Sequence, residues 1–213
     1  MKIQHKFLLM ALALLSLGMY SCEKDDETAH VSFVTTYPTV TLNGEEWNVV
    51  PQGEAFTDSG AVAMEGDKEI DVTTSGTVDT STPGVYLITY TATNSDGFSA
   101  SATRKIGVIS PEAAAIDLSG QYQRNAGAGG ISTVTRLEPG FYTSDNVGGV
   151  ADPGPSTTVR FYHYDVDEIA APPQDVLGST FETVDGSVIP GVSYSWVVLN
   201  SGYGDALRTF VKL

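Results

Sequence analysis

Hydrophobic and polar residues alternate in short runs along most of the chain. In residues 84–92, Tyr86, Ile88, Tyr90 and Ala92 occupy every second position, and Thr89 and Thr91 lie on the opposite face. The turn-forming residues 94–97 follow, and residues 98–108 alternate in the same phase. A period of two is typical of a strand with one buried face. The pattern therefore predicts a β-hairpin over residues 84–108.

The same pattern recurs on both sides of this hairpin, and no segment shows a long helical period. The most helix-friendly stretch, Pro111–Ile116, is too short to be stable alone. We therefore predict an all-β protein with an N-terminal immunoglobulin-like β-sandwich at residues 34–109. A linker at residues 110–116 leads to residues 117–213, predicted to form a second antiparallel β-sandwich or a small β-barrel of roughly eight strands.

The N-terminus has a different pattern. Lys2 and Lys6 precede an apolar run over residues 7–20, which is shorter than the roughly 20 residues that a membrane-spanning helix needs. A basic start followed by a short apolar run is typical of a secretory signal. We interpret residues 1–21 as a signal peptide that ends at Ser21, immediately before Cys22.

Cys22 is the lone cysteine of the chain. A lone cysteine in an exported protein favours modification over an internal disulfide, and the small residue before it resembles a lipoprotein cleavage site. At the positions of Met19 and Tyr20, the usual motif has Leu and a small residue. We predict lipidation of Cys22, with ordinary secretion and a free thiol as the alternative; acyl chains on the cysteine would anchor the protein in the membrane.

Residues 22–33 form a predicted tether. It begins with an acidic run that resembles the export tag of surface-exposed lipoproteins in some Gram-negative bacteria; the simpler interpretation is a solvated linker. The resemblance implies an outer-membrane protein that is exposed on the cell surface. The tag residues are Lys24, Asp25, Asp26 and Glu27.

Charge limits the set of partners. The chain has a net charge of −15. Removal of residues 1–21 takes away Lys2 and Lys6 and leaves 9 basic and 26 acidic residues, a net charge of −17. A protein with this charge is not expected to bind nucleic acid or anionic lipid electrostatically, although carboxylates are suitable ligands for Ca²⁺.

The hairpin region also resembles a known family. Residues 76–97 contain the motif Gly-x-Val-Asp-Thr-x-x-Pro-Gly-x-Tyr-x-Ile-x-Tyr-x-Ala-x-Asn-x-x-Gly. This is similar to bacterial surface immunoglobulin-like repeats, and residues 53–61 resemble an early strand and turn of the same family. The resemblance implies an immunoglobulin-like fold. It does not imply one function, since such modules serve as spacers, adhesive units and accessory domains.

No motif predicts an enzyme. After residue 22 there are two histidines, His30 and His163, and neither belongs to a zinc-type pair. No Gly-x-Ser-x-Gly motif is present. We interpret His163 as an ordinary strand residue and expect no catalytic residues and no cofactor, with calcium as the one ion to consider.

The candidate calcium ligands follow an aromatic strand. Asp165, Asp167 and Glu168 lie close together in the sequence, and oxygen ligands suit Ca²⁺. The alternative interpretation is a solvated loop.

Aromatic residues give the remaining signal. Tyr and Trp can stack on the apolar face of a sugar while a polar group takes a hydroxyl. We predict Tyr162, Tyr164, Trp196 and Tyr203 as ligand-binding residues. Alternation within residues 193–199 also allows Trp196 to be a core residue. Trp47 is a further candidate for an exposed contact, or it could pack against an edge.

These features support a cell-surface binding module, with glycan as the expected ligand, carried on an immunoglobulin-like spacer. The order of anchor, spacer and terminal domain resembles the auxiliary lipoproteins of Sus-type glycan-uptake systems. The expected partners are thus the membrane, through the anchor, and a glycan or an outer-membrane uptake complex. The alternative is a structural or adhesive surface protein with a protein partner.

Overall fold

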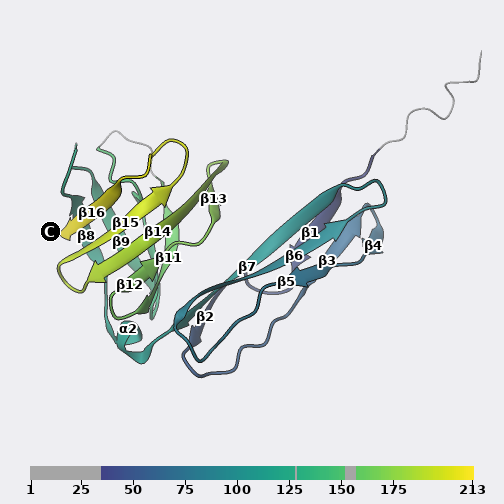
Figure 1. Cartoon of the computed structure of the whole chain (residues 1–213), viewed down its shortest axis with the longest axis horizontal. Coiled ribbons are helices and arrows are strands. Elements are labelled where there is room, and N and C mark those ends of the chain that lie inside the picture. Colours follow the sequence, from purple (N-terminus) through teal and green to yellow (C-terminus); the bar gives the residue numbers. More distant parts are fainter. Residues whose placement is uncertain (1–34, 128, 152–156) are drawn as a thin grey trace, which may run out of the picture. The chain divides into compact units, whose positions relative to one another are not determined.

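The computed structural model describes residues 35–213 apart from residue 128 and residues 152–156. Residues 37–213 form one compact unit, and the described elements lie in it (Figure 1). They are strands with one short helix, which confirms the predicted all-β class. The predicted signal peptide, Cys22 and the acidic tag (Lys24, Asp25, Asp26 and Glu27) lie outside the described residues.

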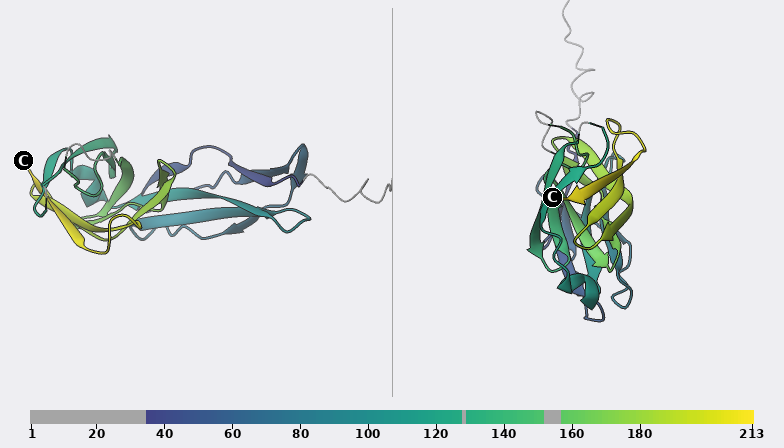
Figure 2. Two further views of the ribbon diagram at one scale, coloured as in Figure 1. Left: turned by 90° about the horizontal axis from the view of Figure 1, so that it is seen from above. Right: turned by 90° about the vertical axis from the view of Figure 1, so that its left-hand side faces the viewer.

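The first part of this unit is a β-sandwich. One sheet has the order β1-β3-β4 and the other has the order β2-β7-β6-β5, with β2 parallel to β7; Figure 2 shows the two sheets as separate layers. The predicted hairpin is β6 and β7, paired from Gly84–Val108 to Thr93–Ser99. The strands are β1 (Pro38–Leu42), β2 (Trp47–Pro51), β3 (Ala61–Glu65), β4 (Lys68–Ile70), β5 (Thr73–Ser75), β6 (Gly84–Thr93) and β7 (Ser99–Ile109).

The sandwich core contains a buried cation as well as aliphatic side chains. Arg104 lies in phase with Ile106 and Val108 on β7 and is 1% exposed. Its guanidinium pairs with Asp58 at 3.3 Å and donates to the carbonyl oxygen of Gly60 at 3.0 Å. A buried cation is tolerated when it is paired and hydrogen-bonded in this way. Arg104 thereby connects β7 to the loop that precedes β3.

A single helical turn, α2 (Pro111–Ala115), follows β7. Ser110 caps it by accepting a hydrogen bond from the Ala113 amide, and Pro111 stands in the first turn, where its missing N–H costs nothing. Ala113 is fully buried, so the predicted linker is a packed part of the fold. Within the described part of the chain, no helix has the length and apolar character to cross a membrane.

The second part of the unit is a barrel. Among the described residues, eight antiparallel strands follow one another around it, and β12 pairs with β14 to close the ring, while β13 pairs with β14 alone. Of the two predicted alternatives, a second sandwich or a small barrel, the structure is therefore the barrel. The strands are β8 (Gly120–Arg124), β9 (Ile131–Glu138), β10 (Phe141–Ser144), β11 (Val159–Asp165), β12 (Glu168–Ala170), β13 (Gln174–Val176), β14 (Ser179–Ile189), β15 (Ser193–Leu199) and β16 (Leu207–Lys212).

Side chains fill the barrel interior. Trp196, Phe161 and Phe210 pack there with rings 5.4 to 6.1 Å apart. The Tyr142 hydroxyl donates to the carbonyl oxygen of Ile116 at 2.8 Å, which ties the segment before β8 to the barrel. An eight-stranded barrel is narrow enough for side chains to occupy its whole interior. Ligand sites are therefore expected outside the barrel lumen.

One strand belongs to both cores. Every residue from Arg104 to Ile109 of β7 is buried, and so is Ser110, which follows the strand. Even-numbered side chains face the sandwich core, whereas Lys105, Gly107 and Ile109 face the barrel strand β11. The Tyr162 hydroxyl donates to the carbonyl oxygen of Lys105 at 3.1 Å. The sandwich and the barrel thus share a packed interface.

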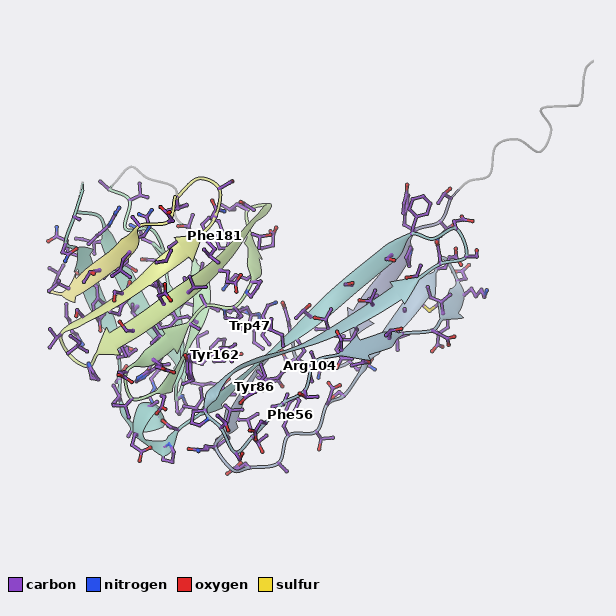
Figure 3. All side chains as sticks on the ribbon, in the orientation of Figure 1. Trp47, Phe56, Tyr86, Arg104, Tyr162 and Phe181 are labelled. Carbon is purple, nitrogen blue, oxygen red and sulfur yellow. The ribbon has the colours of Figure 1, made fainter. Side chains whose placement is uncertain are left out.

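Aromatic rings form the centre of this interface. The ring of Trp47 on β2 lies 5.7 Å from the ring of Phe141 and 5.9 Å from that of Tyr162, and the rings of Phe141 and Tyr162 stack at 4.9 Å. Figure 3 labels Trp47 and Tyr162. Lys105 lies 4.9 Å from the centre of the Trp47 ring and forms an ion pair with Glu46. Burial of large rings is the strongest single contribution to such an interface. Trp47 is therefore an interface residue.

Gly107 permits the close approach of the two domains. A Cβ added there would lie 2.3 Å from Cδ1 of the buried Tyr162 ring. We expect Gly107→Ala to lower the free energy of unfolding by about 2 kcal/mol, since overpacking a fixed site costs about 1–3 kcal/mol. Urea titration measures the change.

The matched control is Gly84→Ala on the adjacent strand. A Cβ at Gly84 would make an ordinary contact of 3.5 Å with Tyr86, so its stability should stay within about 0.5 kcal/mol of the parent protein. Equal stabilities for the two variants would contradict the role given to Gly107.

Candidate functional site

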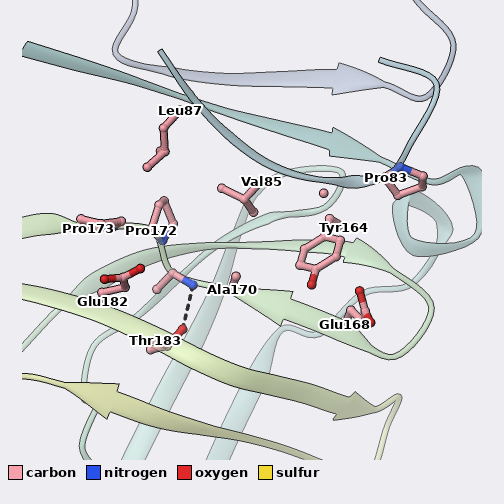
Figure 4. Close-up of a pocket in the computed structure, with 12 residues that line it drawn as sticks. Pro83, Val85, Leu87, Tyr164, Glu168, Ala170, Pro172, Pro173, Glu182 and Thr183 are labelled. Atoms are coloured by element: carbon pink, nitrogen blue, oxygen red, sulfur yellow. Dashed lines mark hydrogen bonds between the residues drawn. The ribbon is translucent and has the colours of Figure 1, made fainter. Parts of the chain in front are cut away.

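A cleft of about 390 Å³ lies beside this interface. Strand β6 forms one wall, and strands β11, β12 and β14 with the segment after β12 form the other (Figure 4). Its volume is in the range of small-ligand sites. The lining residues are Pro83, Gly84, Val85, Leu87, Tyr164, Glu168, Ala170, Ala171, Pro172, Pro173, Glu182 and Thr183.

Tyr164 is the aromatic residue of the cleft. It lies two positions after Tyr162 on β11, and its backbone carbonyl accepts a hydrogen bond from the Ser110 amide at 2.9 Å. The side chain is half-buried. Burial, followed by a hydrogen bond with Glu168 and the charge of that carboxylate, raises the pKa of Tyr164. The hydroxyl is therefore a neutral hydrogen-bonding group over the physiological range.

Two carboxylates give the cleft its charge. Glu168 begins β12 and Glu182 lies on β14, and none of the described residues that line the cleft is a lysine, arginine or histidine. Thr183 accepts a hydrogen bond from the Ala171 amide at 2.8 Å, which holds the segment before Pro172 against β14. The apolar part of the wall comes from Val85, Leu87 and the proline pair. The cleft thus combines an apolar surface, one aromatic ring and two anionic acceptors.

A second cleft of about 480 Å³ contains Trp47, Glu46, Arg160 and Asp175. Here the aromatic ring is already engaged, because the Arg160 guanidinium lies 5.5 Å and the Lys105 ammonium 4.9 Å from its centre. A ring held between cations and other rings offers little surface for a ligand to stack on. The cleft at Tyr164 is the better candidate for this reason.

Two of the predicted ligand residues are buried. Tyr162 and Trp196 are each 0% exposed. Tyr162 is sealed between the domains, and the Trp196 indole donates to the carbonyl oxygen of Val147 at 2.9 Å inside the barrel. The prediction that they contact a ligand is corrected: both are structural, because the outward face of β11 meets the sandwich and Trp196 points into the lumen.

Tyr203 is half-buried and helps to close one end of the barrel. Its ring lies 5.5 Å from Phe181, and the Arg208 guanidinium lies 5.1 Å from its centre. Burial, together with the nearby Arg124, lowers the pKa of Arg208. Both arginines donate to the carbonyl oxygen of Gly148, at 3.0 and 3.4 Å. The structure thus places Tyr203 in a packed cluster, away from Tyr164.

The predicted calcium ligands do not form a metal site. Asp165 and Glu168 are paired across the β11–β12 turn that contains Asp167. Asp165 accepts a hydrogen bond from the Val166 amide at 2.8 Å, and Glu168 interacts with Tyr164. Among the described residues, no three acidic, histidine or cysteine side chains are grouped to hold an ion. The calcium prediction at these residues is therefore corrected, and Glu168 belongs to the cleft.

His163 is 0% exposed, on the face of β11 opposite Tyr164. Its Nε2 lies 3.2 Å from the carbonyl oxygen of Val166, and its Nδ1 has no hydrogen-bond partner in the described part of the chain. Since a carbonyl only accepts, Nε2 carries the proton in the neutral ring. Burial lowers the pKa of His163 below its usual value of 6.5, although the Val166 carbonyl and Asp165 oppose this.

Sequence reasoning identified Tyr164 and Glu168 but not the rest of the cleft. Glu182 alternates with buried residues on β14 and has the pattern of any exposed strand residue. The one available signal was the Pro172-Pro173 pair, which interrupts pairing and marks a segment that can line a site. Val85 and Leu87 alternate with Tyr86 and Ile88 on β6, and the contact of their face with a second domain has no local signature in the sequence.

Comparison with known proteins supports the immunoglobulin-like assignment of the first domain. Residues 40–108 match the family described as bacterial surface protein, Ig-like domain, which confirms the resemblance seen in residues 53–61 and 76–97. No curated protein matches the chain closely enough to count as a relative.

Solved structures provide two further comparisons. The crystal structure of a lipoprotein from Bacteroides thetaiotaomicron is similar, with 24% identity and a TM-score of 0.40, over 83% of this chain and 100% of that one. The M60 catalytic domain with the CBM51-1 and CBM51-2 domains of Clostridium perfringens ZmpB has 14% identity and a TM-score of 0.30, over 85% of this chain and 22% of that one.

The buried histidine generates a test of stability against pH. Below about pH 6.5, the unfolded chain binds a proton at His163 that the folded chain does not, so the free energy of unfolding should fall as the pH is lowered from 7 to 5, by at most about 1.4 kcal/mol per pH unit. His163→Gln should reduce this slope in urea titrations at several pH values. Parallel pH profiles for the parent protein and the variant would contradict the assignment.

Proposed function

We propose that this protein is a cell-surface lipoprotein that binds an uncharged or amino-bearing glycan in the cleft at Tyr164. The observation that carries the proposal is the composition of the cleft: its described lining residues include one tyrosine, an apolar wall and two carboxylates, and no cationic side chain. Rings and apolar walls accept the apolar faces of sugars. Carboxylates accept strong hydrogen bonds from sugar hydroxyls or ammonium groups.

Charge narrows the class of glycan. Glu168 and Glu182 would repel the carboxylate of a uronic acid or a sulfate group at short range. The net charge of −15 adds to this repulsion at longer range. A neutral sugar or an amino sugar meets no such cost. We propose that the protein binds the glycan and does not catalyse a reaction on it.

The location of the protein is part of the proposal. The basic and apolar start, Cys22 and the acidic residues after it support a lipid-anchored protein on the outer face of the outer membrane. The match of residues 40–108 to a bacterial surface family is consistent with this location. We propose that the sandwich presents the cleft to glycans at the cell surface, as an auxiliary component of an uptake complex.

Binding can be tested with a soluble chain of residues 28–213, which contains the whole of the compact unit 37–213. We expect this chain to retain neutral or amino oligosaccharides on a glycan array. Tyr164→Ala should weaken binding about fivefold or more in calorimetry, because stacking of a sugar on one ring contributes about 1 kcal/mol or more. Glu182→Gln should also weaken it.

The matched controls are Tyr37→Ala and Glu69→Gln, which change exposed residues that do not line this cleft. Both should bind as the parent protein does. Binding that persists in Tyr164→Ala would move the site elsewhere, preferential binding of acidic glycans would exclude the proposed ligand class, and binding to no glycan would reject the function.

The anchor has a separate test. Cys22→Ser should abolish incorporation of a labelled fatty acid and release the protein from the membrane fraction, since the chain has no other cysteine to acylate. Replacement of Lys24, Asp25, Asp26 and Glu27 by alanine should keep the label but reduce cleavage by protease added to intact cells. Membrane retention of an unlabelled Cys22→Ser protein would contradict the proposed anchor.

A further inference from the structure

Two arginines, Arg124 and Arg208, lie next to one another at one end of the barrel. Arg124 is the last residue of β8 and lies in phase with the buried Tyr122. Arg208 lies on the neighbouring strand β16 (Figure 1), in phase with the buried Phe210, and is 6% exposed. Because Phe210 pairs with Arg124, the two arginines are diagonal neighbours on the inward face of the sheet. We call them the arginine pair.

One carbonyl oxygen brings the two guanidiniums together. The carbonyl oxygen of Gly148 accepts hydrogen bonds from Arg208 at 3.0 Å and from Arg124 at 3.4 Å. Arg208 also donates to the carbonyl oxygen of Tyr203. A glycine permits the close approach of this loop, because a Cβ at Gly149 would lie 2.7 Å from Cδ of Arg124. The acceptors that hold the arginine pair are therefore uncharged backbone groups.

No described carboxylate neutralises the arginine pair. Within the described part of the chain, the ion pairs involve Arg104 and Lys105 of the sandwich. The Nε atoms of Arg124 and Arg208 are buried and have no hydrogen-bond partner among the described residues. Burial and then the charge of Arg124 lower the pKa of Arg208, with Tyr203, and no described carboxylate, acting in the opposite direction. Two like charges are thus held close together where water is largely excluded.

Such an arrangement is costly, and an anion would lower the cost. A carbonyl carries only a partial charge, so it compensates a buried cation less well than a carboxylate does. Arginine keeps its proton at physiological pH and cannot relieve the repulsion by releasing it. Arg124 is only partly buried, and among the described residues its guanidinium makes one hydrogen bond, through Nη1. Other N–H groups of Arg124 therefore remain for a ligand.

We propose that the arginine pair binds a compact oxyanion, namely the carboxylate, sulfate or phosphate group of a small ligand. The planar fork of a guanidinium matches two oxygens of such a group. The net charge of −15 repels anions at long range, so recognition depends on these local contacts. The site is separate from the proposed glycan site, because neither arginine lines the cleft at Tyr164.

Thermal melting of the soluble chain 28–213 tests the proposal. Sodium phosphate, sulfate and acetate are each compared with sodium chloride at an ionic strength of about 0.15 M, where charges are screened beyond about 8 Å. A ligand that binds the folded chain stabilises it, so the melting temperature should rise with the concentration of an oxyanion above its value in chloride. Arg124→Gln should weaken the apparent affinity about tenfold or more, because it removes hydrogen bonds between charged groups.

The matched control is Lys68→Gln, which removes one cation from an exposed position on β4. Its response to each oxyanion should equal that of the parent chain. Arg124→Lys keeps the charge but loses the planar fork, so its affinity should lie between those of the parent chain and Arg124→Gln. Circular dichroism checks that each variant is folded, and Arg124 is chosen over Arg208 because it is less buried.

Calorimetry with glucuronate and glucose sulfate distinguishes the sources of the oxyanion. Tighter binding of these sugars than of the inorganic ions would identify an acidic sugar as the ligand, and the reverse order would identify a free ion. Either ligand should be lost in Arg124→Gln and retained in Tyr164→Ala, which separates this site from the cleft. No rise in melting temperature with any oxyanion, or an equal rise in the parent chain and Arg124→Gln, would overturn the proposal.

Discussion

The fold depends on one stretch of β7 whose two faces are both buried. In residues 104–109, alternate side chains enter the sandwich core, and those between them pack on β11 of the barrel. A shift of this strand by one residue would move each set of side chains to the opposite face and break the packing on both sides. Arg104 fixes the strand on the sandwich side through Asp58, and Gly107 fixes the distance on the barrel side by admitting the Tyr162 ring. Ser110 then caps the helix that leads directly into the barrel.

The candidate cleft follows from this joint. Tyr162 and Tyr164 project from the same face of β11 toward the sandwich, but only the first is sealed there. The second reaches space beside β6, where the hairpin contributes Val85 and Leu87 to the opposite wall. The barrel supplies Tyr164, the two carboxylates and the proline pair, and the sandwich supplies Val85 and Leu87. Packing of the two domains therefore forms the cleft.

The alternating pattern predicted much of the fold, because each hairpin strand in residues 84–108 has one side that must avoid water. The alternating pattern failed for segments in which the side chains on both faces of the strand are buried. Residues 104–109 include Arg104 and Lys105, whose charges suggest exposure, yet one lies in an ion pair inside the sandwich and the other against Trp47. Similarly, Phe161 and Tyr162 are consecutive and both buried. Tyr164 and Glu168 were identified from composition, whereas Glu182 entered the site only through the pairing of distant strands.

The order of strands around the barrel has a consequence for how this part of the chain folds. The first strand, β8, is completed by the last, β16, which also supplies Phe210 to the interior. Residues about ninety positions apart must therefore meet before the ring can close, and contacts of such long range make folding slow. A barrel of this kind cannot finish folding on a chain that is still emerging. If the chain is exported unfolded, the barrel can close only after its final strand has crossed the membrane. The sandwich precedes the barrel in the chain, so β7 can already provide the surface on which β11 packs.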